Sequence, residues 1–174
     1  MTRQITVGNV KIGGGEPVVI QSMLNTKTTD VEGSLSQIKA LQTAGCQIAR
    51  LAVPNMEAAK SFAAICKESS LPLVADIHFD YQLAIAAAEG GAAKIRINPG
   101  NIGGEDRVQA VVEVCKDKHI PIRIGVNGGS LDKKLLEKYG HPTAEALVES
   151  AFQHLELLEK YGFYDTCVSM KSST

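Results

Sequence analysis

Two stretches decide the fold, Lys94-Ile-Arg-Ile-Asn98 and Ile122-Arg-Ile-Gly-Val-Asn127. In each, aliphatic residues alternate with polar or charged ones, and successive side chains on a β-strand face opposite sides. One face of each strand is therefore aliphatic and suits contact with a layer of helices. The other face carries arginine and asparagine, so these two strands predict both a core and a polar site.

The same unit repeats along the chain, because each short aliphatic run is followed by a helical pattern. The predicted strands are 18–23, 48–53, 73–78, 94–98, 122–127 and 166–171. The predicted helices are 30–45, one from about 55, one from 80 to 90, 105–119, a short insert at 131–139, and 143–161. Asp30, Asn55, Asp80 and Thr143 are residue types that cap helix N-termini.

Six β/α steps in strict alternation require parallel strands joined by helical crossovers, in a doubly wound sheet or a barrel. Polar side chains follow every strand instead of gathering at one switch point, which favours the barrel. A complete barrel has eight strands and typically ~250 residues. We therefore expect residues 1–174 to form one incomplete domain, a TIM-type (β/α)8 barrel truncated after about six strands. A small hairpin of 5–7 and 10–12, turning at Gly8-Asn9, precedes it.

Composition narrows the function classes. The chain is 44% hydrophobic and 21% charged, as in soluble globular proteins. Its formal net charge of −1 argues against nucleic acid and against a polybasic membrane patch. No apolar run is long enough to span a membrane and no signal-peptide core is visible, so we expect a cytoplasmic protein with a small ligand. The cysteines stand far apart with no CxxC pair, which predicts no metal site and no disulfide framework.

Arg50, Arg96 and Arg123 lie inside aliphatic strands, and Lys171 ends the last one. A buried guanidinium cannot shed its charge, so each needs an anionic partner. The planar fork of arginine binds phosphate through two hydrogen bonds, and several such groups at one barrel mouth suit a phosphate ester with two or more charges. The alternative is an internal salt-bridge network in which Asp76 neutralises an arginine.

Three further features stay open. His78 shares a strand face with Asp76, so it could move a proton, bond an ester oxygen or bind a metal, although a third metal ligand is not visible. The glycine-rich loops 99–104 and 128–129 could bind anions through backbone N–H groups or could only make tight turns.

Several ordered motifs resemble the 4-hydroxy-3-methylbut-2-enyl diphosphate synthase family of the non-mevalonate route of isoprenoid synthesis. They are Gln21-Ser-Met-Leu-Asn-Thr26, Ala49-Arg-Leu-Ala-Val-Pro54, Ala75-Asp-Ile-His-Phe79, Lys94-Ile-Arg-Ile-Asn-Pro-Gly-Asn101 and Ile122-Arg-Ile-Gly-Val-Asn-Gly-Gly-Ser-Leu131. The resemblance runs from the hairpin to Lys171. It implies a barrel that binds 2-C-methyl-D-erythritol 2,4-cyclodiphosphate. The substrate-binding residues it implies are Ser22, Thr26, Arg50, Asp76, His78, Arg96, Asn98, Arg123, Asn127 and Lys171.

The resemblance also implies a reductive ring opening with loss of water, at a four-iron four-sulfur (4Fe–4S) cluster held by three cysteines and a glutamate. In the family these ligands sit in a C-terminal iron–sulfur domain, so we expect the cluster ligands beyond Thr174 and the domain absent from this chain. The full-length protein is then expected to be an iron–sulfur oxidoreductase of the EC 1.17.7 type. It would be a homodimer reduced by flavodoxin or ferredoxin. We expect this chain alone to hold no catalytic residue and to be inactive.

Two other functions stay open. One is a pteroate-synthase-like transferase, which uses a related barrel and an anion site. The other is a non-catalytic phosphate-binding module, since the chain lacks the cluster ligands.

Overall fold

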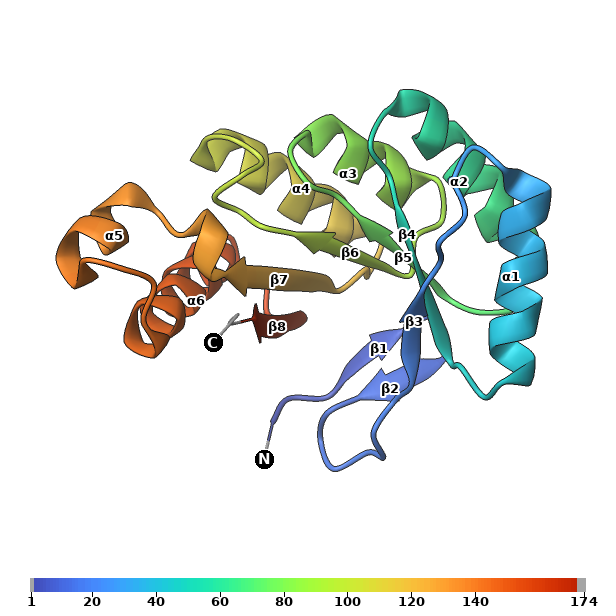
Figure 1. The fold of residues 1–174 in the computed structure, drawn as a ribbon, viewed down its shortest axis with the longest axis horizontal. Helices are drawn as coiled ribbons and strands as arrows, with labels where there is room; N and C mark the ends of the chain where they lie inside the picture. Colours follow the sequence, from blue (N-terminus) through green and yellow to red (C-terminus); the bar gives the residue numbers. More distant parts are fainter. Residues whose placement is uncertain (1, 172–174) are drawn as a thin grey trace.

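The computed structural model describes residues 2–171, and its centre is a sheet of six parallel strands (Figure 1). The strands are β3 (Gln21–Met23), β4 (Ile48–Ala52), β5 (Leu73–Asp76), β6 (Lys94–Ile97), β7 (Ile122–Asn127) and β8 (Thr166–Lys171). They pair in the order β3-β4-β5-β6-β7-β8. The chain therefore moves one strand sideways at every crossover, as in a barrel wall, without the reversal of a doubly wound sheet. The predicted incomplete barrel is confirmed as a curled half barrel.

Four of the six helices in the described residues begin at the capping residues that the sequence predicts. The helices are α1 (Val31–Thr43), α2 (Met56–Glu68), α3 (Tyr81–Glu89), α4 (Glu105–Asp117), α5 (Lys133–Tyr139) and α6 (Ala144–Lys160), with a 3₁₀ turn η1 at Gly128–Ser130. The side chains of Asp30, Asn55, Asp80 and Thr143 each accept a hydrogen bond from a backbone N–H in the first turn of α1, α2, α3 and α6. Each cap satisfies a donor that the helix itself leaves unpaired.

The hydrophobic core lies between the sheet and the helices. Figure 1 shows α1 to α4 in a row along one side of the strands. Ile95, Ile97, Ile122 and Ile124 are fully buried in one cluster with apolar residues of these helices, such as Phe62. The aliphatic strand face therefore packs on the helices, as predicted, and the face that carries the arginines is left on the concave side of the sheet.

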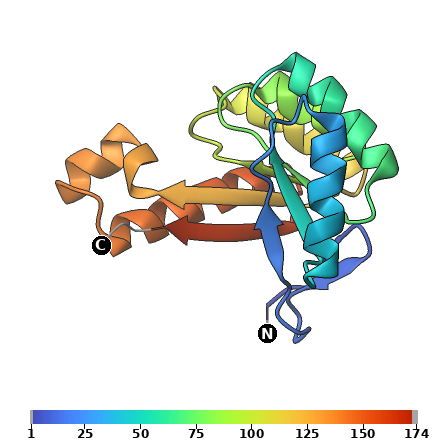
Figure 2. The same cartoon turned by 45° about the vertical axis from the view of Figure 1, so that its right-hand side comes forward.

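The hairpin covers the end of the sheet where the strands begin (Figure 2). β1 (Ile5–Val7) and β2 (Val10–Ile12) are antiparallel, and Gly8 turns the chain with a φ of +60°. Ile5 and Val7 pack on Ile48 and Val74 in a second small apolar cluster. With that end covered, the concave face opens where the strands finish, next to α5.

Four predicted strands are too long. β4, β5 and β6 end at residues 52, 76 and 97 instead of 53, 78 and 98, so His78 follows β5 instead of lying in it, and the first strand differs most. Residues 18–23 were expected to form the first barrel strand, but only Gln21–Met23 does so, and Val18 and Ile20 are 93% and 57% exposed. In the described chain β3 has a neighbour on one side only, β4. Alternating aliphatic residues cannot show that a strand lies at an edge, where half of its partners are missing.

Candidate functional site

A cleft of about 430 Å³ opens on the concave face at the carboxyl ends of the strands. Its lining comes from five strands or the loops that follow them: Arg50, His78, Phe79, Arg96, Asn98, Asn101, Arg123, Gly125, Val126, Asn127, Ser169, Met170 and Lys171. This is the end at which barrel enzymes place their active sites. It gathers all four basic residues that the sequence singles out.

The strand register explains why these side chains meet. One row across the sheet joins Asp76, Arg96, Arg123 and Cys167 as successive partners on β5 to β8. Partners in parallel strands lie side by side and share a face. Arg50 lies one pleat lower, beside Val74 on β5. Arg96 therefore stands beside Asp76, Arg123 stands beside Arg96, and Arg50 reaches the carboxylate from the neighbouring strand β4.

Asp76 is fully buried and uses both of its oxygens. Arg50 donates from Nε and Nη2 to Oδ2, at 3.1 and 2.6 Å, and Arg96 donates from Nη1 to Oδ1 at 3.2 Å. His78 Nε2 lies 3.4 Å from Oδ2, and this imidazole is about half exposed. Asp76 thus orients Arg50 and Arg96 and neutralises part of their charge.

Arg123 differs from them. Within residues 2–171 it forms no ion pair, and its side chain is only partly exposed at the cleft. Burial lowers the pKa of its guanidinium below the ordinary value, and the positive charges of Arg50 and Arg96 lower it further. A group whose charged form is disfavoured in this way gains from a bound anion. Asp76 supplies one negative charge to three guanidinium groups, which leaves the cleft positive.

Lys94 adds to this charge and was not among the predicted site residues. It is 3% exposed on the concave face, and its Nζ donates to Gln21 Oε1 at 3.3 Å across the half barrel. Burial lowers the pKa of its ammonium. The sequence feature that could have identified Lys94 is the alternation along β6, which puts it on the same face as Arg96. Ser169 is a second missed residue, placed by the same alternation beside Lys171.

The remaining predicted residues divide into two groups. Asn98 and Asn127 line the cleft, and the buried Asn98 Oδ1 accepts a hydrogen bond from Gly100 N at 3.1 Å, which shapes the following loop. Ser22 and Thr26 do not line it. Ser22 pairs with Ala49, whose side chain faces the helices, and Thr26 Oγ1 lies 3.0 Å from Ser34 Oγ of α1.

The two glycine-rich loops differ in whether their backbone conformation requires glycine. Gly103 has a φ of +118°, so the turn before α4 requires glycine. Gly128 and Gly129 have no positive φ, and tight turning alone does not explain them. The loop 128–129 directly follows Asn127 at the cleft.

The chain's own residues do not fit an iron–sulfur cluster. Within residues 2–171, no three histidine, cysteine, aspartate or glutamate side chains lie close enough together to hold a metal ion. The four cysteines are free, and burial raises the pKa of Cys66 and of Cys115 to about 12, which keeps these thiols protonated. A cluster needs thiolates, which these two buried cysteines do not supply.

The cluster ligands themselves are expected elsewhere, beyond Thr174. Thr174 lies outside the described residues, which end at Lys171. The location of the ligands therefore stays a prediction from the resemblance.

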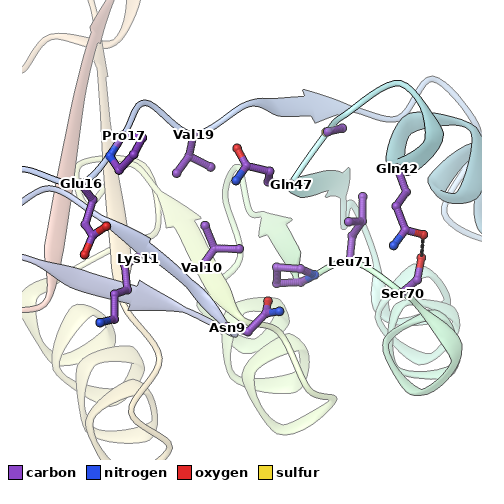
Figure 3. Close-up of a pocket in the computed structure, with 12 residues that line it drawn as sticks. Asn9, Val10, Lys11, Glu16, Pro17, Val19, Gln42, Gln47, Ser70 and Leu71 are labelled. Atoms are coloured by element: carbon purple, nitrogen blue, oxygen red, sulfur yellow. Dashed lines mark hydrogen bonds between the residues drawn. The ribbon is translucent and has the colours of Figure 1, made fainter.

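A second hollow, of about 520 Å³, lies at the opposite end of the sheet, between the hairpin and the loops that precede β4 and β5 (Figure 3). Its polar lining is mostly neutral, and Ser70 Oγ donates to Gln42 Oε1 at 2.7 Å. Among the described residues that line it, only Lys11 and Glu16 are charged, one of each sign. It lacks the excess positive charge that marks the cleft.

The comparison with known families decides the assignment. Residues 2–174 match the model of the GcpE TIM-barrel domain. The chain belongs to this family. Within the described residues, no helix is both long enough and apolar enough to span a membrane.

Close relatives of this GcpE barrel carry one name. The 4-hydroxy-3-methylbut-2-en-1-yl diphosphate synthases (flavodoxin) of Halalkalibacterium halodurans and Bacillus subtilis are each 59% identical to it over 172 residues. These matches cover 99% of this chain but 47% and 46% of the relatives. The chain therefore spans about half the length of the curated relatives it matches.

Solved structures resemble the GcpE barrel in fold alone. Dihydropteroate synthase of Yersinia pestis superposes with a TM-score of 0.66 at 14% identity, over 95% of this chain and 61% of that one. A truncated 3-deoxy-D-arabino-heptulosonate 7-phosphate synthase of Thermotoga maritima gives 0.64 at 14% identity, over 99% and 58%. The pteroate-synthase-like alternative thus shares the barrel, while family membership supports the isoprenoid synthase.

Proposed function

We propose that this chain is the substrate-binding barrel of a 4-hydroxy-3-methylbut-2-en-1-yl diphosphate synthase, and that its cleft binds 2-C-methyl-D-erythritol 2,4-cyclodiphosphate. The name of the relatives supports the product, and the resemblance of the motifs supports the substrate. The observation that carries the proposal is Arg123, a partly buried guanidinium at the cleft that forms no ion pair within residues 2–171. A diphosphate supplies the negative charge that Asp76 does not.

In this proposal the residues divide the binding between them. Arg123 and Lys171 contact phosphate oxygens directly, and Arg50 and Arg96 do so with the guanidinium edges that Asp76 leaves free. Asn98 and Asn127 lie beside them and offer amide groups to the hydroxyls of the substrate. Holding both phosphates rigidly keeps the ring in one orientation while it opens, and rigid placement of a reacting group lowers the barrier.

The electrons for ring opening come from outside this barrel. We propose flavodoxin as the donor, as the name of the relatives indicates. A 4Fe–4S cluster, if held by residues beyond Thr174 as the resemblance implies, would supply the redox chemistry. Ferredoxin as donor, the homodimer, the EC 1.17.7 class and the cytoplasmic location stay predictions from the sequence.

Titration calorimetry tests the binding step directly. In the whole gene product that contains this chain, Arg123→Ala is expected to weaken binding of the cyclic diphosphate by about 1 to 3 kcal/mol, the usual loss for charged hydrogen bonds. Arg107→Ala is the matched control, because Arg107 lies on α4 against the ring of Tyr81 and outside the cleft. Unchanged affinity in Arg123→Ala would remove this residue from the site.

The same preparation separates an enzyme from a non-catalytic phosphate-binding module. With reduced flavodoxin and the cyclic diphosphate, the whole gene product is expected to release the linear 4-hydroxy-3-methylbut-2-enyl diphosphate. Tight binding without turnover, in protein that carries its cluster, would favour the module.

A further inference from the structure

Gly125 occupies the middle of β7, where no turn requires it. The residue lies in a regular strand and has no positive φ, so the backbone accepts any L-residue there. A glycine inside a strand weakens it and often marks a place where another group approaches closely. The alternation of β7 places position 125 on the concave face, between Arg123 and Asn127.

The group that approaches is the guanidinium of Arg96. A Cβ built on Gly125 would lie 2.5 Å from Arg96 Nη2, 2.7 Å from Nε and 2.9 Å from Cζ. Carbon atoms do not come this close, so any side chain at position 125 must displace the guanidinium. Moving the guanidinium away would disturb the hydrogen bond from its Nη1 to Asp76 Oδ1, which is 3.2 Å long.

Arg96 therefore reaches toward β7, with Nη1 on Asp76 and its Nη2–Nε edge at Gly125. Arg96 and Gly125 both line the cleft. The register explains the geometry, since Arg96 pairs with Arg123 and Gly125 comes two residues further along the same face of β7. Any side chain at position 125 would occupy the space beside the Nη2–Nε edge of Arg96, which is the edge that Asp76 leaves free.

We propose that Gly125 is a positioning residue of the anion site. Because it has no side chain, it leaves the space that the Arg96 guanidinium needs to lie between Asp76 and the ligand. This deepens the proposed function and rests on it for the ligand. The carbonyl and N–H of Gly125 remain in the sheet, and its contribution to binding runs through Arg96.

A double-variant cycle in the whole gene product tests this, with the cyclic diphosphate as the titrant. Gly125→Ala is expected to weaken binding about 10-fold to 100-fold, similar to the loss of one charged hydrogen-bonding group. Adding Gly125→Ala to Arg96→Ala is expected to change affinity little, because the Cβ then meets no guanidinium. In the Gly125→Ala protein, Arg96→Lys is expected to recover part of the affinity, since an ammonium needs less space. Wild-type affinity in Gly125→Ala, or the same loss in both backgrounds, would overturn the proposal.

Urea unfolding of wild type, Gly125→Ala, Arg96→Ala and the double alanine variant, without ligand, separates the two proposals. Gly125→Ala is expected to lower the free energy of unfolding strongly in the wild-type background and little in the Arg96→Ala background. This comparison remains informative if the single variant Gly125→Ala folds poorly. An equal cost in both backgrounds would overturn the role of Gly125. If Arg96→Ala itself leaves binding unchanged, the site assignment fails, while the stability cycle still decides the contact between positions 96 and 125.

Discussion

Asp76 holds two guanidinium groups with a single buried carboxylate, and this shared ion pair is the main polar contact beneath the cleft. The side chains of Arg50 and Arg96 are 22% and 17% exposed. Removing the carboxylate leaves two largely buried cations side by side, next to a third. Such uncompensated charges destabilise a fold more than the original ion pair stabilised it.

Asp76→Asn is therefore expected to lower the free energy of unfolding by about 2 to 4 kcal/mol, measured in urea. The control is Asp165→Asn, because Asp165 pairs with Arg3 at 3.2 Å on the surface and both side chains are more than half exposed. A surface pair of this kind contributes ~1 kcal/mol or less. Inorganic pyrophosphate is expected to recover part of the loss in Asp76→Asn, since an anion that binds only the folded state stabilises it. Equal losses in the two variants would contradict this role of Asp76.

The sequence predicts which residues face the cleft but not which of them pair. Alternation along β6 and β7 is enough to put Arg96 and Arg123 on one face. The sharing of Asp76 by Arg50 and Arg96 depends on the register between strands, which no single strand contains. The role of Gly125 could not be predicted from the sequence for the same reason. It depends on the close approach of Arg96 from the neighbouring strand. Ser22, predicted from a motif, falls on the face toward the helices.

At the scale of elements, specific side-chain hydrogen bonds at helix starts and helix ends stabilise the fold. Asn55 Oδ1 accepts from Ala58 N at 2.8 Å and opens α2. Asn55→Ala is expected to cost about 1 kcal/mol of unfolding free energy, while Asn55→Asp keeps the acceptor and most of the stability. Urea unfolding of the two variants measures the difference. A loss in Asn55→Asp as large as in Asn55→Ala would show that the side-chain oxygen is not what matters.

Two helices end on the same hexapeptide, Leu-Leu-Glu-Lys-Tyr-Gly, at 135–140 and 157–162. In each, the lysine and the tyrosine both donate to one glutamate: Lys138 and Tyr139 to Glu149, Lys160 and Tyr161 to Glu105. The final glycines, Gly140 and Gly162, have φ values of +75° and +69°, the usual way to end a helix. The hexapeptide thus ends a helix and ties its last turn to another segment.

These contacts predict a dependence on pH. The hydrogen bond from each lysine, and then that from each tyrosine, lowers the pKa of Glu105 and Glu149 below the ordinary value of 4.5. A glutamate with a lowered folded pKa stabilises the fold at neutral pH, and that contribution disappears as the pH falls below about 4.5 toward the folded value. Between pH 6 and 3, wild type is expected to lose more stability than a Glu105→Gln, Glu149→Gln variant. Parallel pH profiles would contradict this, and the difference is small because the groups are exposed.

From β4 onward each strand starts at the predicted residue, while β4, β5 and β6 end one or two residues before the predicted ends. The bounds of β7 agree with the predicted range, as do those of β8, because turn residues bracket both aliphatic runs. The prediction was wrong for β3, whose aliphatic residues Val18 and Ile20 lie outside the strand. Aliphatic composition predicts that a segment is extended. How many of its residues form a strand depends on pairing with the neighbouring strand.

At the scale of the molecule, the half barrel has two open edges in its described part, β3 and β8, each paired on one side only. Met23 and Val168 on these edge strands are 45% and 38% exposed. Unpaired strand edges invite pairing with another chain. Residues 1–174 expressed alone are therefore expected to sediment as species larger than a monomer. Val168→Lys, which adds a charge to an edge, is expected to reduce this association. A wild-type fragment that stays monomeric across a concentration series would contradict the prediction.

The basic cleft at the carboxyl end of the sheet is proposed to bind a diphosphate. A crystal structure of the whole gene product with the cyclic diphosphate bound tests this most directly. We expect phosphate oxygens within hydrogen-bond distance of Arg123 and Arg96, with Asp76 still holding Arg50 and with Gly125 beneath the Arg96 guanidinium. A diphosphate bound in the hollow beside the hairpin, or in the cleft but away from both Arg96 and Arg123, would contradict it.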